Sequence, residues 1–130
     1  MKMNPKLLLF GFEELPAILA VEAAAGPFGA EIVPVARMDY NKPLAALAGL
    51  DTGHALAPPY HGGPLGGRMI VLCGLDDRIG ELLPAMAKAG AGAECLKAVL
   101  TEHNRDWNPL VLFAELCRER QALRSRRDGV

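Results

Sequence analysis

Aromatic residues are scarce in this chain of 130 residues: they make up 5% of it, and tryptophan occurs once. Leu, Val, Ile and Ala must therefore fill most of the core, and a hydrophobic content of 51% is enough for one domain of this length. An excess of one charge is missing as well. The formal net charge is −1, so nothing global predicts binding to nucleic acid or to a membrane surface.

Three further absences narrow the functional class. Ser125, in the C-terminal tail, is the only serine, which argues against a serine hydrolase although His61-Gly62-Gly63 resembles an oxyanion turn. Neither GxGxxG nor GxxxxGK[ST] occurs, so no nucleotide-binding loop is expected. No stretch approaches the about 20 apolar residues that span a bilayer, and no signal peptide is recognisable.

The three cysteines, Cys73, Cys95 and Cys117, form no CxxC pair. An odd number without a metal-binding spacing favours a reducing compartment, with the thiols acting as small core residues. Cys73 ends an apolar run and Cys117 falls on the apolar stripe of a predicted helix, so both are expected to be structural. We therefore expect a cytoplasmic protein without a nucleophilic thiol.

The most prominent feature of the sequence is an apolar run that occurs twice. Residues 6–14, KLLLFGFEE, and 68–77, RMIVLCGLDD, share a basic residue, an apolar run, a glycine, a large apolar residue and two acids. A short apolar run that ends in a turn is typical of a buried strand. We therefore predict two β-α-β-α repeats, at about 6–49 and 69–120.

These repeats are expected to form a single α/β domain over residues 1–130. Strands are expected at 6–10, 31–36, 69–75 and 95–101, and helices at about 14–25, 43–48, 77–88 and 109–123. A Gly/Pro-rich loop over 50–67 joins the repeats, and its length makes it either functional or mobile. Pro34 cannot donate a ladder hydrogen bond, so the second strand is expected at a sheet edge, with the first and third strands central.

Two sheet arrangements satisfy this placement. A parallel 2-1-3-4 sheet with helices on both faces is favoured, because the helix after the second strand supplies a crossover. A ferredoxin-like sheet, with an antiparallel central pair and helices on one face, is the alternative. The acid pairs Glu13/Glu14 and Asp76/Asp77 would lie near each other in the first arrangement and at opposite ends of the sheet in the second.

Each repeat also contains an Asp-aromatic-Asn-Pro-Leu pattern, with one extra residue in the first copy, that is typical of a helix start. Trp107, Asn108 and Pro109 are expected to be the hydrophobic staple, the N-cap and the first helical residue. Tyr40 and Asn41 are expected to play the first two parts in the other repeat. Trp107→Ala should then destabilise the protein more than Tyr40→Ala.

Acidic and histidine side chains are the candidates for chemistry. Asp76 and Asp77 stand at a helix start, like the first acid pair, where the helix dipole favours acids by about 0.3–1 kcal/mol and where Asp76 is expected to be the N-cap. His54 and His61, with these two acids, are weak metal candidates, because no recognised ligand spacing connects them. No catalytic residue, cofactor or metal is therefore expected.

The strand KAVLT, residues 97–101, is followed by Asn104, Trp107 and a helix that contains Leu116 and Glu119. This order of elements, over about 69–120, resembles a small bacterial family of uncharacterised domains. No catalytic signature is among the matching residues. The resemblance implies a compact α/β domain and transfers no site residue.

The sequence thus predicts a non-enzymatic binding or protein-interaction module. A small enzyme or metal-binding domain that uses the acid pairs and the loop histidines is the alternative. The helix at 14–25 has one charge after its start, and its surplus apolar surface, with that of the helix at about 109–123, predicts a homodimer; another protein partner is the alternative. The basic tail, 118–127, is expected to complement a helix dipole, and neither nucleic acid nor membrane is an expected partner.

Overall fold

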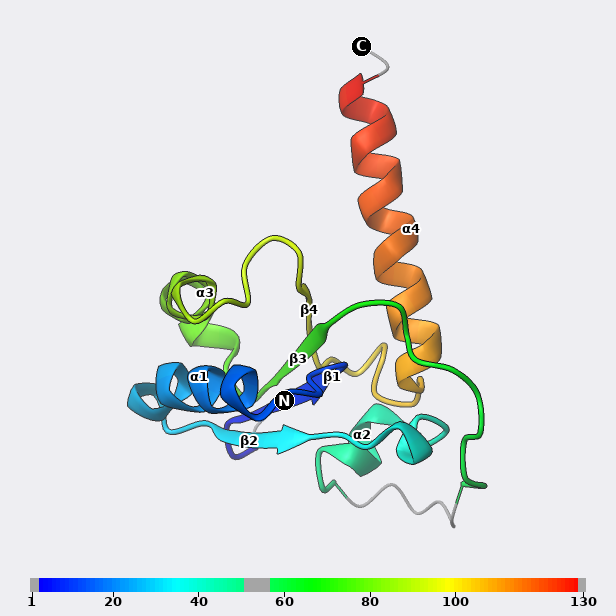
Figure 1. Ribbon diagram of the computed structural model, residues 1–130, viewed down its shortest axis with the longest axis horizontal. Helices are drawn as coiled ribbons and strands as arrows, with labels where there is room; N and C mark the ends of the chain where they lie inside the picture. Colours follow the sequence, from blue (N-terminus) through cyan, green and yellow to red (C-terminus); the bar gives the residue numbers. More distant parts are fainter. Residues whose placement is uncertain (1–2, 51–56, 129–130) are drawn as a thin grey trace.

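A four-stranded sheet lies between two pairs of helices in the computed structural model, which describes residues 3–50 and 57–128 (Figure 1). The strands are β1 (Lys6–Phe10), β2 (Glu31–Pro34), β3 (Met69–Cys73) and β4 (Leu96–Val99). The helices are α1 (Leu15–Ala25), α2 (Leu44–Leu47), α3 (Ile79–Lys88) and α4 (Pro109–Asp128). Single 3₁₀ turns occupy Gly26–Phe28, Arg37–Asp39 and Asp76–Arg78.

The strand order is β2-β1-β3-β4, which confirms the prediction that β1 and β3 are central. β1 and β2 run parallel, as do β3 and β4, but β1 and β3 are antiparallel, with Leu8 opposite Val71. The favoured all-parallel arrangement is therefore wrong at the central ladder. The reason is that α2 has a single turn and does not carry the chain back across the sheet, so that Gly67, just before β3, lies against Gly11, just after β1.

Alternate side chains of the central strands face two separate cores. Leu7 and Leu72 belong to the core under α1 and α3, whereas Leu8 and Val71 belong to the core that includes residues of α2 and α4. Helices thus cover both faces of the sheet, as Figure 1 shows. The fold combines the antiparallel central pair of the ferredoxin-like alternative with the two covered faces of the favoured arrangement.

The start of α4 follows the sequence prediction. Asn108 is the N-cap, because the backbone N–H of Val111 donates to its Oδ1 at 3.0 Å, and Pro109 is the first helical residue. Trp107 packs against the core that contains Leu112, although its own side chain is only half-buried.

The start of α2 does not follow it. Asn41 does not cap the helix: its Nδ2 donates to the carbonyl of Pro58 at 3.0 Å, and Pro43 occupies the N-cap position. The first helical N–H groups instead donate to backbone carbonyls of a distant turn, with Leu44 to Trp107 at 2.8 Å and Ala45 to Arg105 at 2.9 Å. Tertiary acceptors therefore replace the expected side-chain cap.

α4 packs through its first three turns and then leaves the sheet. Leu112 is buried, and Phe113 and Leu116 pack beside it, whereas Cys117, expected on the buried stripe, is exposed. Beyond Arg120 the side chains described are exposed, and the helix projects from the body of the molecule (Figure 1). No helix in the described part of the chain is both long and apolar enough to cross a membrane.

Candidate functional site

The two acid pairs lie at opposite ends of the sheet. Glu13 and Glu14 follow β1, and Asp76 and Asp77 follow β3, which runs antiparallel to β1. All four residues are exposed. They do not form a shared carboxylate site, and Asp76 is not the N-cap of α3, because it lies in a 3₁₀ turn before the helix and makes no side-chain cap.

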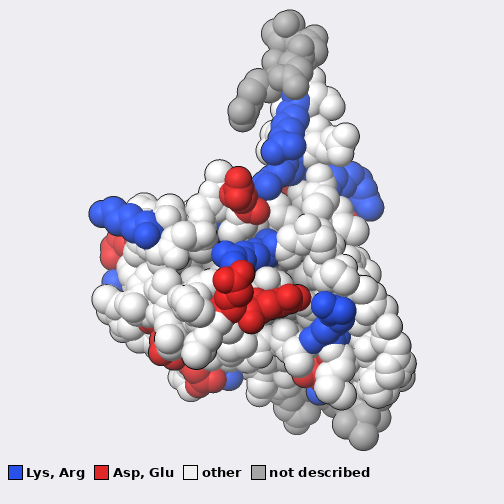
Figure 2. All heavy atoms as spheres, in the orientation of Figure 1, with Lys and Arg blue, Asp and Glu red and all other residues white. Residues whose placement is uncertain are grey.

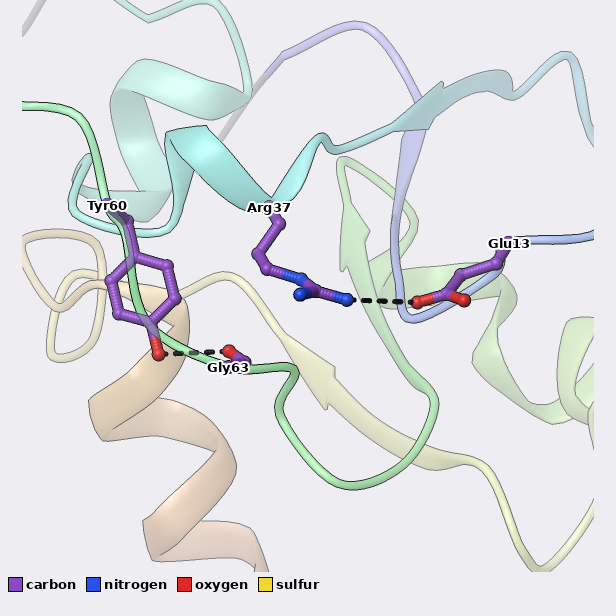
Figure 3. A network of polar contacts seen from close by, with 4 residues as sticks. All are labelled: Glu13, Arg37, Tyr60 and Gly63. Atoms are coloured by element: carbon purple, nitrogen blue, oxygen red, sulfur yellow. Dashed lines mark hydrogen bonds and ion pairs between the residues drawn. The ribbon is translucent and has the colours of Figure 1, made fainter.

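A hydrogen bond within the histidine-containing loop closes a turn. The hydroxyl of Tyr60 donates to the carbonyl of Gly63 at 3.0 Å, which closes the turn around exposed His61 (Figure 3). His54 lies outside the described residues. Within 3–50 and 57–128, no three His, Cys, Asp or Glu side chains are grouped so that they could hold a metal ion.

Two of the three thiols are core residues, as predicted. Burial raises the pKa of Cys73 to about 12; Lys6 acts in the opposite direction and Asp76 adds slightly to the rise. Burial also raises the pKa of Cys95, although nearby cations, Lys97 first among them, oppose it. The prediction is wrong for Cys117, because α4 turns this thiol to the surface.

A crevice opens at the carboxyl ends of β1 and β2. The chain leaves β1 toward α1 on one face of the sheet, and leaves β2 toward α2 on the other. Ligands of open α/β sheets bind where the connections of adjacent parallel strands diverge in this way. The crevice has a volume of about 590 Å³ and is lined by residues 11–13, 34–37 and Tyr40.

Glu13 and Arg37 meet across this crevice from different elements. Figure 3 shows Arg37, on the turn after β2, pointing toward Glu13, with Nη2 3.5 Å from Oε1. Tyr40 is 3% exposed, and its ring packs between those of Phe10 and Tyr60, with centroids 6.1 and 5.6 Å away. Burial raises the pKa of Tyr40, whereas Arg37 and a hydrogen bond with the Gly11 backbone lower it.

A second hollow, a groove of about 430 Å³, runs between the outer edge of β4 and the helix α4. Apolar side chains of both elements and of the turn between them line it, and charged side chains stand beside them. The lining residues are Lys97, Ala98, Val99, Thr101, His103, Asn104, Trp107, Leu112, Glu115, Leu116 and Glu119.

The outer edge of β4 carries backbone groups that face away from the sheet. Leu96 donates its N–H to the carbonyl of Arg68, just before β3, at 3.0 Å, and Leu100 donates to the carbonyl of Leu72 in β3 at 2.9 Å. Because successive backbone groups of a strand alternate in direction, those of Lys97 and Val99 face outward. The opposite edge of the sheet, β2, contains Pro34, which has no N–H to donate.

Asn104 marks where this open edge ends. Its Nδ2 donates to the carbonyl of Val99 at 3.0 Å, and its Oδ1 accepts from the N–H of Thr101 at 2.9 Å. These are the two hydrogen bonds that a residue of a neighbouring strand would make. From the sequence, Asn104 was noted only as part of the family resemblance, and its hydrogen bonds to the end of β4 were not predicted. The Thr-x-x-Asn spacing at 101–104 is the pattern that could have indicated them.

The basic side chains of α4 are partly engaged within the molecule. Arg118 pairs with Glu115, and Arg120 donates to the carbonyl of Ala93 at 2.7 Å. Figure 2 shows basic side chains along this helix and, beside its base, acidic and basic side chains next to one another. No single continuous basic surface is visible on this face, and the expectation that the tail binds no nucleic acid stays a prediction.

Residues 68–123 match the model of a family described as a domain of unknown function (DUF3783). The matched segment spans β3 to α4, which confirms the resemblance of this part of the chain to a family of uncharacterised domains. No curated protein and no solved structure matches the chain. All the residues that line the groove between β4 and α4 fall within the matched segment.

Proposed function

We propose that this protein is a non-enzymatic interaction module that holds an extended segment of a partner protein along β4, in the groove between β4 and α4. The observation that carries this proposal is the pairing of an open strand edge with an apolar helix face. A segment added to a sheet edge gains affinity from backbone hydrogen bonds, and its alternate side chains enter pockets that give specificity.

The lining of the groove defines the partner segment. The outward N–H and C=O of Lys97 and the outward N–H of Val99 offer one short stretch of ladder, which ends where Asn104 occupies the carbonyl of Val99. Trp107 and Leu116 provide an apolar wall for one side chain of the segment. Glu119 stands on the rim, so a segment with an apolar residue next to a basic one fits best.

The alternative of a small enzyme finds less support. Its strongest version required the two acid pairs to act together, and the antiparallel central ladder separates them.

A cytoplasmic location is part of the proposal, because Cys73, Cys95 and Cys117 are all free thiols.

A homodimer is the second candidate, and one observation favours it. Leu15 and Leu19, one turn apart on α1, are 63% and 50% exposed. The described part of the long loop lies elsewhere: Pro58 and Tyr60 bond to residues near α2. We therefore propose that a second copy covers the apolar face of α1.

The groove can be tested with a display library of random peptides, selected on the full-length protein. Val99→Pro removes an outward N–H and leaves the ladder with β3 intact, whereas Val99→Ala keeps the N–H although it removes more of the side chain. We expect Val99→Pro to weaken the selected peptides at least about tenfold, and Val99→Ala to have a much smaller effect.

Two variants of α4 check that the peptides lie in the groove. Leu116→Glu places a charge on the groove wall, and Leu123→Glu places the same charge on an exposed position further along the helix. Leu116→Glu should abolish binding and Leu123→Glu should leave it unchanged. Equal affinity of Val99→Pro and Val99→Ala for every selected peptide would refute pairing with β4.

A further inference from the structure

We propose that the crevice at the carboxyl ends of β1 and β2 is a second, independent binding site, and that its ligand is a small zwitterion of the α-amino-acid type. The site lies at the other end of the strand order from the groove along β4. Its volume of about 590 Å³ lies within the range of small-molecule sites.

The charges around the crevice select this ligand class. Among the described residues that line it, Glu13 and Arg37 are the charged ones, so the site has one charge of each sign. A phosphate dianion would meet Glu13 as well as Arg37, and Glu14 stands next in the chain. A zwitterion satisfies both side chains at once, with its carboxylate on the guanidinium of Arg37 and its ammonium on Glu13.

The two side chains are available for a ligand. Their contact, at 3.5 Å, is at the long limit of a hydrogen bond, and they are 72% and 47% exposed for Glu13 and Arg37. Exposed ion pairs of this kind contribute little to stability, so a ligand can replace the contact without disturbing the fold.

The floor of the crevice, in contrast, is fixed. Tyr40 is buried against Phe10 and Tyr60, and its N–H donates to the carbonyl of Arg37 at 3.1 Å. Gly11 has a φ of +79° and lies directly against the backbone of Gly67. A closely packed aromatic floor below two exposed charges suits a ligand with an apolar side chain and charged ends.

The test is an NMR titration of the full-length protein with leucine, 4-methylpentanoate and 3-methylbutylamine. These probes share one carbon skeleton and differ in which charged groups they carry. We expect leucine to shift the amide signals of residues 11–13 and 35–37 in a saturable way. The carboxylate and the amine should bind at least about tenfold more weakly, since each loses one charge-assisted contact.

Matched variants assign the effect to the crevice. Arg37→Gln and Glu13→Gln should each weaken leucine binding at least about tenfold. Arg78→Gln and Glu81→Gln are the controls, because Arg78 and Glu81 form a similar exposed pair, 3.1 Å apart, after β3 and so at the opposite end of the sheet from the crevice, and they should change nothing.

Three results would overturn the proposal. They are the absence of saturable shifts at the crevice with leucine, equal binding of 4-methylpentanoate and leucine, and tighter binding of inorganic phosphate than of leucine. Val99→Pro should bind leucine normally. Failure of the peptide groove and failure of the crevice are therefore separate outcomes.

Discussion

Gly11 and Gly74 have matching positions at the ends of the two central strands. Gly11 follows β1 with a φ of +79°, and a Cβ there would lie 2.6 Å from the carbonyl oxygen of Gly67, just before β3. Gly74 follows β3 with a φ of +68°, and its Cβ would lie 2.5 Å from the carbonyl oxygen of Met3, just before β1. Each strand thus ends where the chain enters the other. The duplication of the chain stays a prediction, which this correspondence supports.

We expect Gly11→Ala and Gly74→Ala each to lower the free energy of unfolding by more than about 2 kcal/mol, because a left-handed backbone and a backbone contact both oppose a Cβ. Gly29→Ala is the control: its φ is +68°, but nothing lies within 4 Å of the added Cβ. Urea denaturation of the three variants separates the contact from the conformational cost. Equal losses in all three would show that the contacts relax freely.

We expect the loss of stability on removing Tyr40 to exceed that on removing Trp107, which is the reverse of the order predicted from the sequence. Tyr40 is 3% exposed, whereas Trp107 is half-buried. Tyr40→Ala should therefore cost about 3–5 kcal/mol, and Trp107→Ala less. Tyr40→Phe, which keeps the ring, should cost much less than Tyr40→Ala. Chemical denaturation in which Trp107→Ala is the more damaging change would contradict this order.

Asn104→Ala should destabilise the protein by about 2–3 kcal/mol, because it leaves the carbonyl of Val99 and the N–H of Thr101 without partners. Asn108→Ala removes only a helix cap and should cost about 1 kcal/mol. Thermal unfolding of the two variants gives the comparison. The prediction fails if the two losses are the same or if Asn108→Ala is the costlier change.

A thiol reagent at neutral pH should modify only Cys117 in the native protein, because Cys73 and Cys95 are buried. In urea it should modify all three cysteines of the sequence. Rapid labelling of all three thiols in the native protein would contradict this assignment.

The buried thiol of Cys73 should make the free energy of unfolding depend on pH in the alkaline range. Its folded pKa of about 12 lies above the ordinary value of 9.0, so its contribution is complete below pH 9 and is lost between pH 9 and 12. Cys73→Ala should flatten that decline in denaturation curves recorded between pH 9 and 12.

If a second copy covers α1, the combined substitution of Leu15→Glu and Leu19→Glu should convert a dimer into a folded monomer in light scattering. Both side chains are exposed in the single chain, so the fold itself should be kept. Val111→Glu, at a residue 50% exposed on α4, is the control and should leave the dimer intact. A concentration-independent monomer for the unaltered protein would end the dimer proposal.

Local patterns in the sequence were sufficient for the features that depend on neighbouring residues. The apolar runs located β1 and β3, and the Asn108-Pro109 pair located the start of α4. The predicted direction of β3 was wrong because it depends on how the chain returns from β2 to β3, and residues 50–67 have no periodicity that would indicate this. Asn41 failed as a cap because the carbonyls that receive the first N–H groups of α2 lie in a turn remote in sequence.

The candidate sites show the same division. Glu13 was found because acids after a central strand are a visible pattern, but Arg37 has no such signal: it contributes to the crevice only because β2 pairs with β1. The edge of β4 was visible as an outer strand. Its groove was not, since that depends on the angle at which α4 leaves the sheet.

The hydrogen bond from Leu44 to Trp107 has a consequence for the order of folding. The first turn of α2 is completed by the carbonyl of a residue that is synthesised much later, because β3, α3 and β4 lie between Leu44 and Trp107 in the chain. A helix of one turn does not persist alone in water. We therefore expect α2 to form in the last folding step, after β3 and β4 have paired, and a chain truncated before the turn that contains Trp107 to leave this region unfolded.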